Sequence, residues 1–196
     1  MIRIQQLALL FLLLPFLCSA QSPSWNGSPG GKYIPSQGTL KTLIIFAQFP
    51  DDSLDVDHPE WPKNAAPRLL NTWVDSVKSS TPTPGSLTDY FQQMSLGKFT
   101  LIGTTRSVIA PRTRQEYKKR GWTRREIHKE LIESLDSTMD FAEFDRWDYE
   151  GEYNHVERPD GIVDLICIIW RNVADDIPSQ YAMNHAFGFI GDEADL

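Results

Sequence analysis

Five aspartates gather in one acidic segment, and their side chains are the residues of this sequence best suited to chemistry. The segment runs from Asp140 to Trp170 and ends in a strongly apolar run. Carboxylates beside a buried strand must be solvated, paired or bound to a cation, because an unpaired buried charge costs several kcal/mol. Calcium takes about six to eight oxygen ligands, and aspartate-rich loops with a glycine supply them well. The segment therefore predicts a calcium site with these candidate ligands: Asp145, Asp148, Asp160, Asp164 and Asp140.

The sequence leaves two other roles open for these aspartates. Asp140 could cap the turn that follows it rather than bind a cation, and all five carboxylates could cap turns and face water. Calcium binding is therefore an expectation that rests on residue types and spacing.

The histidines and cysteines predict neither a zinc site nor a nucleophile. The four histidines are His58, His128, His155 and His185. No two of them have the i, i+4 spacing that places two imidazoles on one helix face. His128 is expected to be a polar position on an amphipathic helix, and Cys167 a buried, inert thiol. No nucleophile elbow occurs, so a serine or cysteine hydrolase is not favoured.

Composition and charge limit the class of protein. The chain has 196 residues, of which 41% are hydrophobic, enough for one domain with a core. The formal net charge is -7, which argues against nucleic acid or an anionic membrane as a partner, because both require a basic face. The basic run from Arg112 to Arg125 is expected to be a solvated surface rather than a binding patch.

Residues 1–20 have the pattern of an export signal. Arg3 supplies the positive start, Leu7 to Leu17 form the apolar stretch, and cleavage is expected after Ala20. Two alternatives are a lipoprotein with Cys18 as the lipidated residue, which Leu17 disfavours, and a membrane span, for which the apolar stretch is short. The protein is therefore expected to be secreted without a stable membrane anchor. Removal of Cys18 would leave Cys167 alone, so no intrachain disulfide is expected.

The elements that must position the acidic segment can be predicted in order. Residues 21–39 are a flexible lead-in, rich in Ser, Pro and Gly. The continuous apolar run within Leu40–Phe49 indicates a strand covered on both faces, followed by a proline-containing loop to Lys63. A helix is expected from Pro67 to Val77, where apolar residues fall on one stripe.

The second half repeats the alternation of helix and strand. Ser86 and Thr123 are N-cap residues of two expected helices, and Gly97 ends the first of them before a strand at Lys98–Gly103. A loop from Asp140 to Gly161, with one helical turn that places Phe141 and Phe144 inward, leads to a second apolar strand at Ile162–Trp170. The expected fold is α/β, a mixed sheet with packed helices, built around the two apolar strands.

Three runs resemble one protein family in sequence and order. These are LKTLIIFAQFPDD, SLTDYFQQMSLGKFTL, and MDFAEFD followed by DGIVDLICII. Together they resemble the N-terminal half of the catalytic domain of the immune inhibitor A family of secreted zinc metallopeptidases, over roughly Leu40 to Trp170. The resemblance implies an exported endopeptidase that acts on proteins or peptides, with catalytic zinc and structural calcium.

This sequence departs from the family in two respects. The zinc-binding His-Glu-x-x-His helix is absent from it, and an insert, YEGEYNHVERP, stands between Asp148 and Asp160 where relatives have a tight Asp-Gly run. Residues 40–196 are therefore expected to be a partial catalytic domain, the N-terminal portion of a longer precursor. A catalytic zinc needs three protein ligands, so this portion alone is expected to be inactive.

A non-catalytic role is the alternative. The chain has six tryptophans, and Trp61, Trp122 and Trp147 are expected on or beside loops. Exposed aromatic rings suit sugar stacking and protein interfaces, so a secreted, calcium-stabilised module that binds glycan or protein is the second hypothesis.

Overall fold

The protein is mixed α/β, as the sequence predicts, in a computed structural model that describes residues 28–29, 34–52, 60–151, 153–171 and 187–190. Its strands are β1 (Ser28–Pro29), β2 (Gly38–Gln48), β3 (Phe99–Ile109), β4 (Trp147–Gly151), β5 (Asn154–Glu157), β6 (Ile166–Trp170) and β7 (Phe187–Ile190). Its α-helices are α2 (Leu87–Met94), α3 (Arg114–Arg120) and α4 (Arg124–Glu133), and its 3-10 helices are η2 (Leu70–Thr72), η3 (Asp136–Thr138) and η4 (Phe141–Phe144).

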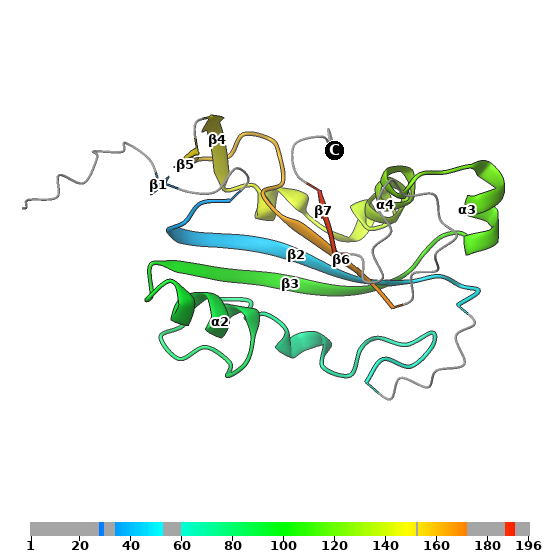
Figure 1. Ribbon diagram of the computed structural model, residues 1–196, viewed down its shortest axis with the longest axis horizontal. Helices are drawn as coiled ribbons and strands as arrows, with labels where there is room; N and C mark the ends of the chain where they lie inside the picture. The colour runs from blue at the N-terminus through cyan, green and yellow to red at the C-terminus, as the bar shows by residue number, and fades with distance from the viewer. Residues whose placement is uncertain (1–27, 30–33, 53–59, 152, 172–186, 191–196) are drawn as a thin grey trace, which may run out of the picture.

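The main sheet has four strands in the order β3-β2-β6-β7 (Figure 1). β2 is parallel to both of its neighbours, with Leu43 opposite Thr104 on β3 and Ile166 on β6, whereas β7 runs antiparallel to β6. A smaller antiparallel sheet has the order β1-β5-β4. The two apolar strands expected at the centre of the fold are therefore adjacent, as β2 and β6.

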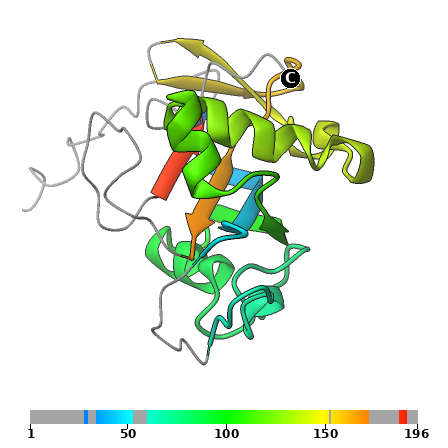
Figure 2. The same cartoon turned by 90° about the vertical axis from the view of Figure 1, so that its right-hand side faces the viewer.

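Helical segments cover both faces of the main sheet (Figure 2). Successive side chains of a strand point to opposite faces. On one face, Leu43 and Ile45 pack with Leu131 of α4, and on the other, Ile44 and Phe46 pack with the segment that contains η2. This two-sided burial explains why the β2 sequence has no polar alternation.

Side-chain caps define the helices. Thr123 and Glu126 form the predicted capping box of α4, and the Ser86 hydroxyl accepts a hydrogen bond from the amide of Asp89 at 3.1 Å. A second capping box, formed by Thr113 and Glu116, begins α3 within the basic run. The sequence analysis missed α3, although its N-terminal signal is the same as that of α4.

The helix predicted from Pro67 to Val77 is wrong, because only η2 forms there. The backbone of this segment bonds to other elements instead: the Asp75 carbonyl accepts from Gly103 of β3 at 2.9 Å, and the Trp73 carbonyl accepts from Leu87 at 2.8 Å. The carbonyls of Trp73 and Asp75 are thus directed to α2 and β3 rather than along the axis of a helix.

Three further expectations, about the acidic loop, the second apolar strand and the lead-in, are corrected. The expected loop after Asp140 contains η4, which buries Phe144 as predicted, but its insert forms the β4–β5 hairpin. Strand β6 begins at Ile166 rather than Ile162. The lead-in was expected to have no regular structure, yet β1 lies within it and pairs with β5.

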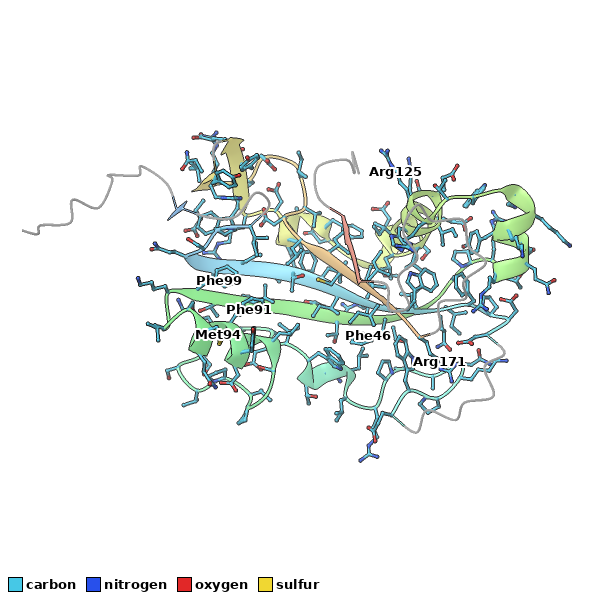
Figure 3. The ribbon with its side chains drawn as sticks, viewed as in Figure 1. Phe46, Phe91, Met94, Phe99, Arg125 and Arg171 are labelled. Atoms are coloured by element: carbon cyan, nitrogen blue, oxygen red, sulfur yellow. The ribbon has the colours of Figure 1, made fainter. Side chains whose placement is uncertain are left out.

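The apolar face of α2 is only partly in the core. Phe91 lies between α2 and β3, in an edge-to-face contact with Phe99 (Figure 3). Tyr90 and Met94, which are also apolar residues of this helix, are 55% and 68% exposed. The helix therefore packs against the sheet along a narrow stripe.

Candidate functional site

Asp145 closes the acidic loop at its base. It directly follows η4, and the β4–β5 hairpin separates it from Asp160. The two carboxylate oxygens of Asp145 accept hydrogen bonds from the amides of Asp160 at 2.9 Å and Gly161 at 2.8 Å. The chain that leaves η4 is thereby fastened to the chain that returns toward β6.

Asp164 makes a second set of hydrogen bonds that joins the two ends of the loop. Its carboxylate accepts from the amides of Arg146 at 2.9 Å and Trp147 at 3.0 Å, while its own amide donates to the Phe144 carbonyl at 2.9 Å. These three bonds position the first residues of the hairpin. They also explain why the strand does not extend through Asp164, as the sequence analysis expected.

Burial and neighbouring charges raise the pKa of Asp164 to about 7. The largest cause is the removal of the carboxylate from water, and the negative charges of Asp145 and Asp160 raise the pKa further, against the two backbone hydrogen bonds. Asp145, Asp160 and Asp164 therefore form an electrostatic cluster, which we call the acidic cluster.

The other two candidate ligands are engaged in other contacts. Asp148 lies on β4 and pairs with Arg158, which also pairs with Glu150 at 2.8 Å. Asp140 is the N-cap of η4, where its carboxylate accepts from the amide of Ala142 at 3.0 Å. The capping role that the sequence left open for Asp140 is thus present.

The acidic cluster has the oxygen donors that calcium prefers, but its carboxylates are not arranged as a calcium site. Its donors are carboxylate oxygens, which hard cations such as calcium prefer. However, within the described residues no group of three or more His, Cys, Asp or Glu side chains is positioned to hold a metal ion. The carboxylates of Asp145 and Asp164 are directed to backbone amides instead.

A second polar group, which the sequence analysis missed, lies at the carboxyl ends of β2 and β6. Asp52 and Arg171 form a buried ion pair of 2.7 Å, and Arg171 also donates to the Trp61 carbonyl at 2.8 Å. Figure 3 shows Arg171 at the end of β6. The carboxyl ends of parallel strands are the usual place for ligand sites in open α/β sheets. The available signal was Arg171 directly after the second apolar run and Asp52 three residues after the end of the first.

His128 belongs to the same end of the molecule. The sequence analysis expected only a polar helix position, but the imidazole is 4% exposed and its Nε2 accepts from Trp170 Nε1 at 3.1 Å. Burial, with a smaller contribution from the Arg124 charge, lowers the pKa of His128 to about 4. The imidazole is thus a neutral hydrogen-bond acceptor at physiological pH.

The remaining candidate side chains are structural in the described part of the chain. Cys167 is half-buried rather than buried, and desolvation raises the pKa of its thiol, which disfavours the reactive thiolate. Trp147 is buried and donates to the Thr39 carbonyl, while Trp61 packs edge-to-face on Phe46. Trp122 is half-buried beside Tyr117. No exposed tryptophan platform of the kind that sugars stack on is formed by these three rings.

Comparisons with known proteins add no relative. No protein-family model matches the sequence, and no curated protein matches it. The expected export signal, with its cleavage site at Ala20, lies outside the described residues, as do His58 and His185. Among the residues that are described, no helix is both long and apolar enough to cross a membrane.

Proposed function

We propose that this chain supplies the N-terminal scaffold of a secreted, zinc-dependent endopeptidase. One observation carries the proposal: the three sequence runs that resemble the immune inhibitor A family fold into neighbouring strands of one sheet and helices in contact with them. The first run forms β2, the second forms α2 and the start of β3, and the third spans η4 and β6. Segments far apart in sequence would be expected to meet in this way if they were parts of one catalytic domain.

In this proposal the chain contributes rigidity and substrate support rather than the reacting groups. The zinc would activate a water for attack on a peptide bond, and its ligands are absent from this sequence. Asp52, Arg171 and His128 hold the carboxyl ends of β2 and β6 and their covering helix together by buried contacts. That end of the sheet would form part of the floor on which protein or peptide substrates are held.

The catalytic assignment has a direct test. We expect the purified protein to show no zinc-dependent cleavage of a fluorogenic protein substrate, because a catalytic zinc needs three protein ligands. We also expect the gene, read beyond the codon for Leu196, to continue into a His-Glu-x-x-His sequence. Chelator-sensitive cleavage by these 196 residues alone, or a stop codon at that position, would contradict the proposal.

The proposal includes calcium at the acidic cluster as a stabiliser of the loop. Asp145, Asp160 and Asp164 would hold the ion, since their negative charges already oppose one another. A bound divalent cation would favour the ionised form of Asp164 and stabilise the folded protein by mass action. We expect the thermal midpoint at neutral pH to rise when calcium replaces a chelator.

An isosteric variant makes the calcium test specific. The Asp160 carboxylate accepts from the amide of Ile162 at 2.8 Å, and the carbonyl of Asn could keep this bond. Asp160→Asn should therefore fold and lose most of the calcium-dependent increase. Asp136→Asn, an exposed position on η3, is the matched control and should keep that increase. An equal midpoint with calcium and with chelator in the unmodified protein would exclude the site.

A further inference from the structure

Strand β3 forms one edge of the main sheet and is as long as the central strand. It covers 11 residues, all in register with β2, and no other described strand pairs with its outer side (Figure 1). An open edge presents a row of backbone donors and acceptors to any extended chain that approaches it. Most proteins shorten, cover or charge such edges.

The hydrogen bonds of β3 show which of its backbone amides point away from β2, toward the open edge. Gly103 donates outward to the Asp75 carbonyl at 2.9 Å, and Phe99 donates outward to the Ser95 hydroxyl at 2.9 Å. Ala110, directly after the strand, donates inward to Gln48 of β2 at 2.8 Å. The backbone N–H groups of successive residues in a strand point to opposite sides. The amides of the odd-numbered residues of β3 therefore face the open edge.

The outward amides after Gly103 have no partner among the residues that the structure describes. These are the N–H groups of Thr105, Ser107 and Ile109. The Arg106 guanidinium donates back to the Thr105 carbonyl at 3.0 Å, which is the one side-chain bond found on this stretch within the same residues. The edge from Thr105 to Ile109 is therefore able to pair with an added strand.

A polar cavity lies beside this edge. Its volume is about 570 Å³, and it is bounded by β3 and by the segment between η2 and α2. Its lining is rich in hydroxyl groups and includes Ser79, Thr81, Thr83, Thr104, Thr105 and Arg106. The cavity can accept polar side chains of a strand that adds to the edge.

The charges on this edge select the partner. Arg106 is exposed and forms no ion pair within the described residues, and the nearby Glu143 is already paired with Lys41. Antiparallel pairing with a second copy centred on Arg106 would place the two Arg106 side chains opposite each other, and like charges directly opposite are destabilising. Pairing centred on Ser107 would place Arg106 opposite Val108, which offers it no carboxylate. A carboxylate is the favourable neighbour.

We propose that the edge of β3 from Thr105 to Ile109 binds an extended acidic peptide segment as an added strand. Backbone hydrogen bonds would supply affinity, and an Asp or Glu opposite Arg106 would set the register. This site lies on the edge of the sheet opposite β7, and it does not depend on the proposed peptidase function.

The test uses a fluorescent seven-residue peptide of alternating Thr and Val with Glu at its centre, and a second peptide with Lys in place of Glu. We expect the Glu peptide to bind, more weakly at high salt, and Arg106→Glu to reverse the preference between the two peptides. Each preference should be about fivefold to tenfold, as expected for one cross-strand charge pair changed from attraction to repulsion. Equal binding of the two peptides, or no binding, would overturn the proposal.

Two variants at one position test the backbone contacts. Thr105→Pro removes an outward amide, at an edge position where proline is tolerated, and Thr105→Val keeps the amide as the matched control. We expect binding to be lost in the first and kept in the second. If the proline variant does not fold, N-methylation at alternate peptide residues replaces it: one set of methylated positions should abolish binding and the other should not. Equal effects of both sets would exclude strand addition, and dimerisation through β3 would show that a second copy, rather than an acidic peptide, occupies this edge.

Discussion

At the scale of single residues, two buried titratable groups act on stability in opposite directions. The pKa of His128 is lowered from 6.5 to about 4, so the folded state excludes a proton that the unfolded state binds between these values. Its contribution makes the protein more stable as pH rises through this window. The pKa of Asp164 is raised from 3.8 to about 7, so its contribution makes the protein less stable as pH rises through nearly the same window.

We expect the substitution His128→Gln to reveal the loss of stability that Asp164 causes as pH rises. The amide oxygen of Gln can accept from Trp170, but the side chain does not titrate. Between about pH 5 and 6.5, the free energy of unfolding of the unmodified protein should change little, whereas that of the variant should fall as pH rises. The slope is at most about 1.4 kcal/mol per pH unit for one proton, and urea unfolding in the presence of chelator measures it.

The control for this experiment is Lys129→Gln, which makes the same replacement at an exposed position on the same helix. It should keep the pH profile of the unmodified protein. Identical slopes for His128→Gln and the unmodified protein would mean that the imidazole is not held neutral in the folded state.

The sequence could predict that Asp164 is unusual but not which groups it contacts. Its isolation within an apolar run indicates a buried charge. Its partners, the amides of Arg146 and Trp147, lie 18 and 17 residues earlier in the chain. No local pattern encodes a contact of that separation, and the same limit explains why Asp148 was grouped with the acidic cluster rather than with Arg158.

At the scale of elements, the sequence was sufficient to predict a helix where the hydrogen bonds that define it join residues close together in the chain. The boundaries of α2 and α4 follow from Ser86 and Thr123, whose caps are bonds to the third residue beyond. The segment from Pro67 to Val77 has a helical stripe as well, but its carbonyls are taken by β3 and α2. Tertiary hydrogen bonds overrode the local preference there, which a sequence pattern cannot reveal.

The insert between Asp148 and Asp160 illustrates the same distinction for strands. It contains β5, which pairs with both β4 and the short β1 from the lead-in. Tyr153, at the turn of the hairpin, has a positive φ of 62°. Asn or Gly is the usual residue for that conformation, so Tyr153 gives no signal of it, and the one local turn signal is Gly151, whose φ is 89°.

At the scale of the whole molecule, the sequence predicted that two strands are buried on both faces but not the order of the sheet. Apolar runs show burial, whereas strand order depends on how the connections cross the sheet. The buried Asp52–Arg171 pair acts at this scale, since it joins residues 119 apart in sequence and fastens the ends of the two central strands.

Removal of one member of this pair should destabilise the whole domain. Arg171→Met leaves the Asp52 carboxylate buried without its arginine, and we expect the free energy of unfolding to fall by about 3 to 5 kcal/mol. Asp52→Leu leaves the arginine charge without its carboxylate, for a similar loss. The double variant Asp52→Leu/Arg171→Met buries no charge at either position, so it should lose less than the sum of the single variants. Urea unfolding of the four proteins measures this coupling, and strictly additive losses would show that the pair makes no joint contribution to the stability of the fold.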